Sequence, residues 1–299
     1  MGKIAFVFSG QGDQFPGMGK ELYETEAAAK RIFALCDAIR PGTSAQCFAG
    51  SAEELSETKN TQPCLFAMEL AAAGVLQEKG VAPDAVAGFS LGEVVAATFG
   101  GVFSDETGFR LVCRRGELMQ REAEKHDTAM AAVLKLTAEQ VQELCGHYTA
   151  MYPVNFNCPG QISVSGLSAE MKDFFTEVRA SGGRALPIKV KGAFHSPFMQ
   201  PAAQDFAEEL ARAEWQKPRI PLYSNLTAEP YGADVEDLLS RQICSPVQWE
   251  RSIRNMIAAG VDTFIEIGPG KTLVNMIRKT DGSVKAITFA EALTEVEKC

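Results

Sequence analysis

The chain has 299 residues, of which 46% are hydrophobic, and it carries a formal net charge of −9. This length allows one large domain or two, with a sizeable core. The acidic balance argues against general nucleic-acid binding, which needs a basic face. No apolar stretch reaches the roughly 20 residues that span a bilayer, and the apolar run at residues 4–8 is too short for a signal peptide.

Eight cysteines are scattered along the chain without a C-x-x-C pair. In a chain of this length without a signal peptide, they are typical of reduced thiols in a cytoplasmic protein. No group of histidines and cysteines has the spacing of zinc ligands, so we expect no metal site.

The first predicted strand is the continuous apolar run at residues 3–8, which is typical of a buried parallel strand. A glycine-rich turn, S-G-Q-G at residues 9–12, follows at the end of the strand where α/β sheets place ligands. No G-K-[ST] follows, which excludes a phosphate loop and leaves a plain strand-to-loop turn as the alternative. Helices are predicted over residues 20–40, near residues 51–59, and over residues 64–79 with Pro63 in the first turn.

Residues 84–100 organise the rest of the chain. An apolar run at 85–87 turns through G-F-S-L-G at 88–92 into an apolar, helix-compatible segment at 93–99. Strand, tight turn and helix are the context of a G-x-S-x-G nucleophile elbow, whose glycines allow a sharp turn and a close approach of neighbouring strands. We expect Ser90 to project its hydroxyl from the sheet, in front of the positive end of the helix. A glycine-rich turn without chemistry is the alternative.

A long helix is predicted over residues 105–124, and it contains the adjacent arginines Arg114 and Arg115. Adjacent arginines usually lie on a solvated helix face, and the pattern alone favours that interpretation for both.

Residues 126–190 predict the order strand, helix, strand, strand, helix, strand, which is the split βαβ or ferredoxin-like unit. We interpret this stretch as a small domain inserted into a large α/β domain of residues 1–125 and 191–299. The large domain then continues with predicted helices at 198–214, 235–243, 250–259 and from 271, and with predicted strands at 220–224 and 263–267.

A serine nucleophile needs a base, because a free hydroxyl is too weakly acidic at pH 7, and histidine is the usual choice. His126 lies among charged residues at the expected domain boundary, and His147 lies in a polar segment. His195 follows a predicted strand in a loop bounded by glycine, serine and proline, the kind of loop that carries catalytic groups. We therefore select His195 as the base for Ser90. No acidic partner for its imidazole stands out, and a backbone carbonyl is the alternative.

Seven motifs together carry a resemblance that runs essentially from end to end. They are S-G-Q-G at 9–12, Q-P at 62–63, the elbow with Glu93, R-G-E-L-M-Q at 115–120, N-F-N-C-P-G at 155–160, A-F-H-S at 193–196, and S-P-V-Q-W at 245–249 followed by E-I-G-P-G at 266–270. In this order they resemble the malonyl-CoA:acyl-carrier-protein transacylases of fatty-acid and polyketide synthesis.

The resemblance implies a hydrolase-like parallel-sheet domain with an inserted ferredoxin-like domain, and an active site in the cleft between them. It implies ping-pong acyl transfer without a cofactor, in which Ser90 attacks the malonyl thioester with His195 as base. The acyl-enzyme then passes malonyl to the phosphopantetheine thiol of an acyl carrier protein. By the same resemblance, the N–H groups of Gln11 and Leu91 form the oxyanion hole, and the main-chain carbonyl of Gln242 holds the histidine.

Arg115 matches the arginine that binds the malonyl carboxylate, so the resemblance overturns the solvated-face interpretation for it but not for Arg114. A guanidinium can grip a carboxylate with two charge-assisted hydrogen bonds, which lysine cannot copy. Gln62 and Asn157 match polar residues of the pocket. Phe194 resembles the malonyl-selecting members, in which it would narrow the space beside the C2 carbon of the substrate.

The chain departs from the family at Phe89, where a histidine commonly precedes the nucleophile. This change puts in doubt the polar contact that the imidazole makes near the pocket, and it could alter acyl selectivity or rate.

The main alternative is an acyl-thioester hydrolase or esterase that uses the same serine and histidine. Arg115 separates the two, because an enzyme for uncharged acyl chains gains nothing from burying a cation. A non-catalytic interaction protein is disfavoured, because Ser90, His195, Gln11 and Arg115 are all present. We therefore expect a cytoplasmic monomer that binds malonyl-CoA and an acyl carrier protein, without nucleic-acid or membrane partners.

Overall fold

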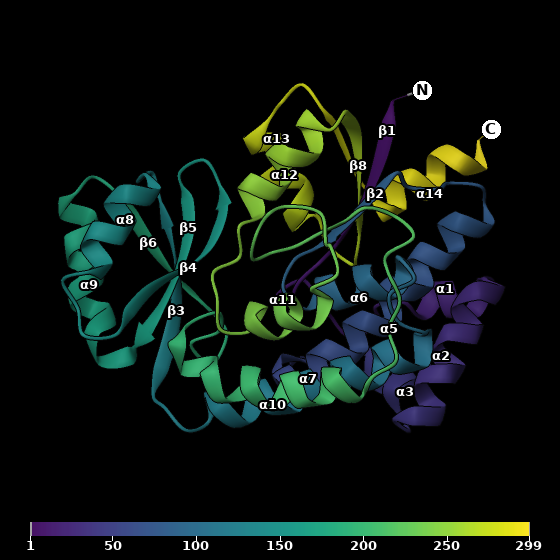
Figure 1. Ribbon diagram of the computed structural model, residues 1–299, viewed down its shortest axis with the longest axis horizontal. Coiled ribbons are helices and arrows are strands. Elements are labelled where there is room, and N and C mark those ends of the chain that lie inside the picture. Colours follow the sequence, from purple (N-terminus) through teal and green to yellow (C-terminus); the bar gives the residue numbers. More distant parts are fainter. Residues whose placement is uncertain (1, 299) are drawn as a thin grey trace.

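Two sheets organise the computed structural model, which describes residues 2–298 (Figure 1). The larger sheet is parallel and has the order β7-β2-β1-β8-β9. Its strands are β1 (Lys3–Phe8), β2 (Ala85–Gly88), β7 (Leu222–Tyr223), β8 (Val261–Ile267) and β9 (Lys285–Thr288). The central strands are apolar and buried over most of their length, as strands covered on both faces must be.

Successive side chains of β1 point to opposite faces of the large sheet, so the core around this sheet forms two clusters. Phe6 and Phe8 pack with helices α5, α6 and α14 on one face, and Ala5 and Val7 pack with α12 and α13 on the other. The helices around this sheet are α1 (Lys20–Thr25), α2 (Ala27–Ile39), α3 (Thr43–Ala49), α4 (Ala52–Ser56), α5 (Thr58–Glu78), α6 (Leu91–Phe99), α7 (Asp105–Ala123), α10 (Gln200–Arg212), α11 (Val235–Gln242), α12 (Trp249–Ala258), α13 (Thr272–Thr280) and α14 (Phe289–Glu297). The result is an open α/β sheet with helices on both sides.

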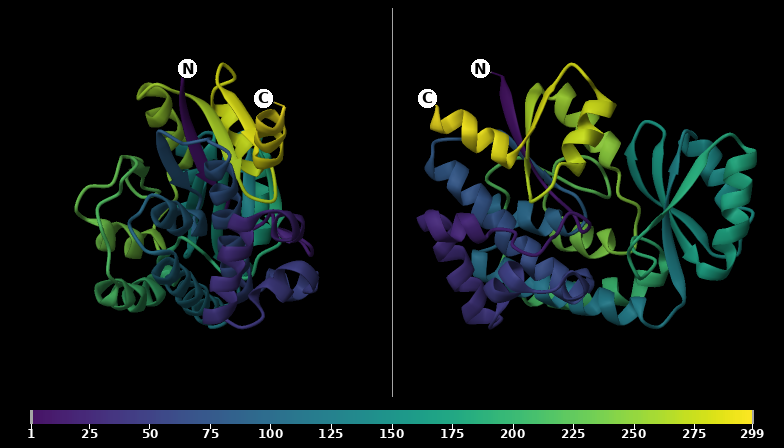
Figure 2. Two further views of the ribbon diagram at one scale, coloured as in Figure 1. Left: turned by 90° about the vertical axis from the view of Figure 1, so that its right-hand side faces the viewer. Right: turned by 180° about the vertical axis from the view of Figure 1, so that it is seen from behind.

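The smaller sheet is antiparallel, with the order β4-β5-β3-β6, and it stands beside the larger one (Figure 2). Its elements are β3 (Thr128–Leu134), α8 (Ala138–Cys145), β4 (Met151–Cys158), β5 (Gln161–Leu167), α9 (Ser168–Ala180) and β6 (Arg184–Ile188). Along β3, Ala131 and Val133 face α8 and α9, whereas Met130 and Ala132 line a cavity on the opposite face. The predicted fold class is confirmed.

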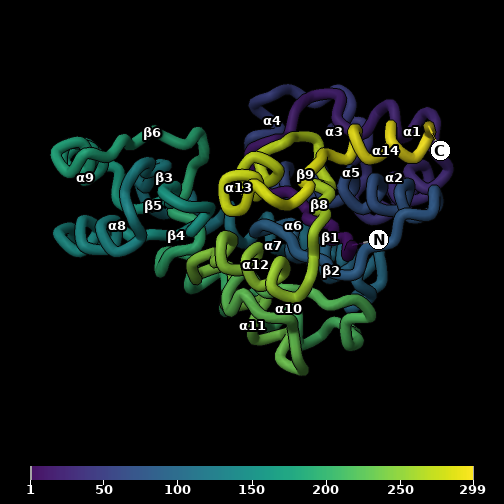
Figure 3. The backbone as a smooth tube through the Cα atoms, turned by 90° about the horizontal axis from the view of Figure 1, so that it is seen from above, coloured from purple at the N-terminus to yellow at the C-terminus, as the bar shows by residue number. Residues whose placement is uncertain are grey.

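Figure 3 shows α8, α9 and the antiparallel sheet set apart from the main body of helices. The chain enters this part after α7 and leaves it after β6. The exact division into residues 126–190 and residues 1–125 with 191–299 stays a prediction.

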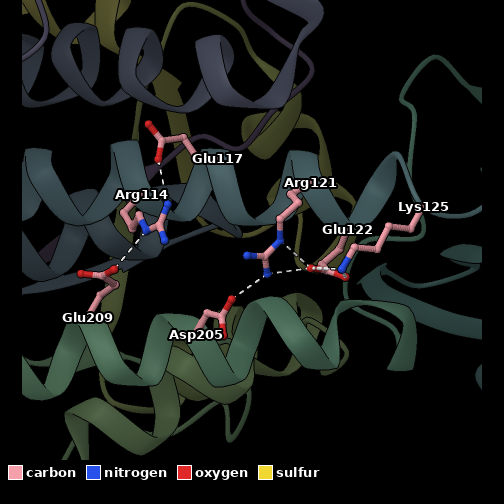
Figure 4. A network of polar contacts seen from close by, with 7 residues as sticks. All are labelled: Arg114, Glu117, Arg121, Glu122, Lys125, Asp205 and Glu209. Carbon is pink, nitrogen blue, oxygen red and sulfur yellow. Dashed lines mark hydrogen bonds and ion pairs between the residues drawn. The ribbon is translucent and has the colours of Figure 1, made fainter.

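Ion pairs join α7 to α10 next to this entry point (Figure 4). Arg114 pairs with Glu209 at 3.0 Å, and Arg121 pairs with Asp205 at 2.7 Å and with the buried Glu122. The two pairs between the helices are partly exposed and each adds little stability. The side chain of Arg114 is 43% exposed, in agreement with its interpretation as a solvated residue.

Three local predictions are wrong. The single helix predicted over residues 20–40 is two helices, because the backbone of Glu26 is extended without any glycine or proline to mark the break. Pro63 lies inside α5 rather than in its first turn, because the helix begins at Thr58, whose N–H donates to the side chain of Gln120 at 3.0 Å. The prediction also lacks α3, β9 and α14, and the four residues of β9 are too few to show a period.

The core between the antiparallel sheet and helices α8 and α9 provides the first test. Phe174 is fully buried between the helices and the sheet, whereas its neighbour Phe175 is partly buried. We expect Phe174→Ala to lower the free energy of unfolding by about 3–5 kcal/mol, because it leaves a cavity, and Phe175→Ala to cost less than half as much. Urea unfolding followed by circular dichroism measures both. Equal losses in the two variants would contradict the packing described here.

Candidate active site

Ser90 stands at the turn between β2 and α6 in a strained conformation, with φ 56° and ψ −110°. A non-glycine residue in such a region costs about 1–3 kcal/mol and persists only when its surroundings hold it there. Glycine is required on both sides of the elbow, at 88 and 92, because neighbouring backbone atoms lie too close for a Cβ atom. A Cβ atom on Gly88 would lie 1.9 Å from the backbone of Gly92, and one on Gly92 would lie 2.4 Å from the carbonyl oxygen of Phe8.

Two side chains from later in the chain hold the backbone of Ser90. Its N–H donates to Oδ1 of Asn225 at 2.8 Å, and its carbonyl accepts from Nε2 of Gln242 at 2.6 Å. Asn225 also donates to the carbonyl of Gly88 at 2.6 Å. Asn225 is absent from the predicted site, because it lies 135 positions from Ser90 and no local motif marks it. The strained backbone conformation of the elbow is therefore stabilised by hydrogen bonds that only the folded chain can make.

The imidazole of His195 lies between Ser90 and Gln242. Its Nε2 is 2.8 Å from Oγ of Ser90, and its Nδ1 is 2.9 Å from the main-chain oxygen of Gln242. Burial, together with the positive charge of Arg115, lowers the pKa of His195 to about 4, so the ring is neutral at pH 7. A carbonyl oxygen can only accept, so Nδ1 carries the proton and Nε2 accepts from the Ser90 hydroxyl.

Arg115 extends from α7 into the same site and is only 1% exposed. Its Nη1 donates to Oε1 of Gln62 at 2.8 Å, and its Nη2 donates to Oε1 of Gln242 at 2.7 Å. Nη2 also lies 3.4 Å from Oγ of Ser90, and Nε is buried without a partner. Burial lowers the pKa of the guanidinium to about 10, which still leaves it charged at pH 7. The site therefore places a desolvated cation beside the nucleophile.

These groups share one cavity of about 280 Å³ between the two sheets. Of the nine site residues predicted from the sequence, all but Gln242 line it. From the large-sheet side these are Gln11, Gln62, Ser90, Leu91, Arg115, Phe194 and His195, and from the antiparallel sheet Asn157. Asn157 donates to Oγ of Ser163 at 3.1 Å, and its own Oδ1 is buried without a partner. Gln242 lies behind the wall and reaches the site through the contacts described above.

The loop after β1 forms the rim of the cavity nearest to the elbow. Leu91 is the first residue of α6, so its N–H is one of those that a helix leaves without an internal partner. A Cβ atom on Gly10 would lie 2.9 Å from the carbonyl of Phe89, which shows how closely the turn carrying Gln11 approaches the elbow. Beneath it, the buried Ser9 hydroxyl donates to the carboxyl group of Glu69.

Glu69 is a further residue that the sequence analysis does not single out. Burial raises the pKa of its carboxyl group well above the usual value. It belongs to the apolar run of α5, where one acidic residue gives no signal of a contact with the loop after β1.

Comparison with known proteins then identifies the family. The family model described as "Acyl transferase domain" matches residues 5–298. The chain belongs to the acyl transferase family.

Relatives within this acyl transferase family align with nearly the whole of this chain. The malonyl CoA-acyl carrier protein transacylase of Bacillus subtilis (strain 168) is 40% identical, and the alignment covers 98% of this chain and 95% of that protein. The crystal structure of the corresponding transacylase from Clostridium perfringens has a TM-score of 0.94 at 33% identity, covering 99% of this chain and 98% of the other. The predicted resemblance is confirmed.

A third relative was solved together with its partner. It is a malonyl-transacylase in complex with a type II polyketide synthase acyl-carrier protein, with a TM-score of 0.95 at 32% identity. The match covers 99% of this chain and all of that one. Within residues 2–298 of the present acyl transferase, no helix is long and apolar enough to cross a membrane, and no three acidic, histidine or cysteine side chains are grouped to hold a metal ion.

Phe89 stands immediately before the nucleophile, at the position where the resemblance implies a histidine. Its ring packs edge-on against Trp249 with the centroids 5.5 Å apart, and it also lines the cavity. The wall before the nucleophile is therefore apolar in this acyl transferase, and His195 is the only histidine among the cavity-lining residues.

The protonation state of His195 yields the second prediction. Its folded-state pKa of about 4 lies below the reference value of 6.5, so the ring should stay neutral as the pH falls from 8 to 5.5. We expect its Cε1–H resonance to shift little over this range, while an ordinary exposed histidine titrates. Proton NMR measures this, and the His195→Ala spectrum assigns the resonance. A midpoint near 6.5 would contradict the proposed desolvation.

Proposed function

We propose that this chain transfers a malonyl group from malonyl-CoA to the phosphopantetheine thiol of an acyl carrier protein, through an acyl-enzyme on Ser90. One observation carries the proposal most strongly: the buried guanidinium of Arg115 lies 3.4 Å from the nucleophile and has only neutral hydrogen-bond partners among the described residues. Burying a cation in this way is costly unless an anion joins it. A carboxylate on the acyl group would supply that anion.

The first half-reaction follows from the hydrogen-bond directions. The Ser90 hydroxyl passes its proton to Nε2 of His195 as Oγ attacks the thioester carbonyl. The N–H groups of Gln11 and Leu91 are assigned to the resulting oxyanion, at the positive end of α6. When the C–S bond breaks, the imidazolium returns the proton to the sulfur, which releases CoA thiol and leaves malonyl-Ser90.

The second half-reaction uses the same groups in reverse. The carrier-protein thiol gives its proton to Nε2 of His195 and attacks the malonyl ester carbon. The Ser90 oxygen then leaves and takes the proton back, which regenerates the free enzyme. The carbonyl of Gln242 holds the ring in the required tautomer throughout, so no acidic residue and no cofactor takes part in these steps.

Selection of malonyl is assigned to Arg115, with Gln62 holding it. The guanidinium can bind the acyl carboxylate through charge-assisted hydrogen bonds. Phe194 lines the same cavity and is 7% exposed, so it limits the room beside the C2 carbon. Asn157 offers an unpartnered amide oxygen from the small-domain side.

A hydrolase or esterase is not favoured, because neither gains from a buried cation at the acyl site. We also assign the enzyme to the cytoplasm. The seven cysteines within residues 2–298 are all free, as is usual in a reducing compartment. The monomeric state stays a prediction.

Loss of the nucleophile tests the covalent route. We expect Ser90→Ala to form no malonyl-enzyme, because no other hydroxyl within residues 2–298 is bonded to His195. Intact-mass spectrometry after incubation with malonyl-CoA, methylmalonyl-CoA or acetyl-CoA detects the adduct, and a chase with holo acyl carrier protein or buffer separates transfer from hydrolysis. Acylation of Ser90→Ala at the wild-type rate would refute the assignment, and loss of the adduct to buffer alone would favour a hydrolase.

Replacing the cation tests selectivity. We expect Arg115→Ala to lower kcat/KM for malonyl-CoA by at least about tenfold, since hydrogen bonds to charged groups are worth about 1.5–3 kcal/mol. The ratio of malonyl to acetyl transfer should fall with it. Arg114→Ala is the matched control, because its side chain is 43% exposed and pairs with surface glutamates. If both variants kept the wild-type ratio, Arg115 would not be the acyl-binding residue.

A further inference from the structure

The two protein groups that hold Arg115 are amides, although carboxylates are the usual partners of a buried arginine. Gln62 on α5 and Gln242 at the end of α11 are both 1% exposed, and each accepts one hydrogen bond from the guanidinium. An amide oxygen satisfies an N–H donor without contributing a net negative charge. The cation is thus positioned but not neutralised.

No carboxylate lies within ion-pair distance of Arg115 in residues 2–298, where the ion pairs all join other residues. The acidic group that affects it electrostatically is Glu93. Glu93 is bound elsewhere: its Oε1 accepts from the N–H of Asn225 at 2.8 Å and from the hydroxyl of Tyr231 at 2.6 Å. This carboxyl group therefore supports the elbow rather than pairing with the guanidinium.

The two glutamines differ in what else they do. Gln242 also donates to the carbonyl of Ser90, so any change there disturbs the nucleophile. Within residues 2–298, the side chain of Gln62 makes one further hydrogen bond, from Nε2 to Sδ of Met119 at 3.4 Å. The charge beside Arg115 can therefore be changed at Gln62 with little effect on the elbow.

We infer that the neutral side chains of Gln62 and Gln242 determine acyl specificity, because they hold Arg115 as a cation without an ion-pair partner among residues 2–298. This inference rests on the proposed malonyl transfer. A malonyl carboxylate supplies the missing charge, whereas an uncharged acyl group leaves the cation desolvated and unpaired. If a glutamate stood at either position, it would form an internal ion pair, and the substrate carboxylate would have to displace it. Neutral partners therefore favour malonyl and disfavour acetyl at the same time.

The decisive variant is Gln62→Glu, which keeps the shape of the side chain and adds one negative charge. We expect the ratio of kcat/KM for malonyl-CoA to that for acetyl-CoA to fall at least about tenfold, because the new carboxylate neutralises the guanidinium charge with which the malonyl carboxylate would otherwise pair. Both rates are measured on the same preparation, so a partly folded sample does not change the ratio.

Two further variants separate charge from shape. Gln62→Met removes the acceptor without adding charge, so we expect slower turnover with both substrates but a ratio within about threefold of wild type, a change of less than about 0.7 kcal/mol. Gln142→Glu adds the same charge on the exposed face of α8 and should leave the ratio unchanged.

The outcomes distinguish this inference from the proposed function. If the wild type forms malonyl-Ser90 but Gln62→Glu keeps the wild-type ratio of malonyl to acetyl transfer, the inference about neutral partners of Arg115 is wrong and the proposed malonyl transfer stands. If Gln62→Met loses the malonyl preference, Gln62 contacts the substrate directly and the inference is overturned, and this variant decides the matter should Gln62→Glu fail to fold. If wild type forms no malonyl-enzyme, the proposed function itself fails.

Discussion

One hydrogen bond, from Oγ of Ser90 to Nε2 of His195 at 2.8 Å, joins residues 105 positions apart, and the site depends on it. Both residues have backbone conformations with positive φ, 56° and 60°, which local propensity disfavours. Gln242 stabilises the pair from behind. Its main-chain oxygen holds the imidazole, its Nε2 holds the carbonyl of Ser90, and its Oε1 holds Arg115. The last turn of one short helix therefore aligns nucleophile, base and cation together, so a change in its position would disturb all three at once.

Buried ionisable groups around the elbow respond to pH in opposite directions. Burial raises the pKa of Glu93 and of Glu266 to about 7, so the folded protein binds more protons there than the unfolded chain. Their contribution to the free energy of unfolding falls as the pH rises from about 4.5 to about 7. His195 acts oppositely, because its lowered pKa makes stability rise between about pH 4 and 6.5. Two raised carboxyl groups act against one lowered imidazole, so together these three groups make the stability fall as the pH rises from about 4.5 to about 6.5.

The features of this protein that can be predicted from its sequence are those encoded by contiguous residues. The elbow, the apolar strand β1 and the order of the antiparallel sheet are local patterns that predict the fold class, whereas a common location for most of the site is implied only by the family resemblance. Asn225 and Glu69 carry no such pattern, since each acts through residues distant in the chain. The break at Glu26 and the early start of α5 likewise depend on packing and on a side chain from α7. Periodicity alone misjudges Arg115, because its burial is decided by helices that the local window does not contain.

The charge of Arg115 also affects the base. Burial, and after it this charge, lowers the pKa of His195, and an imidazole with a pKa of about 4 accepts a proton from serine only weakly. A carboxylate bound to the guanidinium offsets part of that charge, so the pKa of the ring then moves back toward its ordinary value. An uncharged acyl group gives no such compensation. Since Nη2 of Arg115 lies only 3.4 Å from Oγ of Ser90, recognition of the acyl tail and basicity of the imidazole depend on the same charge. In the proposed malonyl transfer, we therefore expect selectivity to be expressed in the rate of acylation as well as in binding.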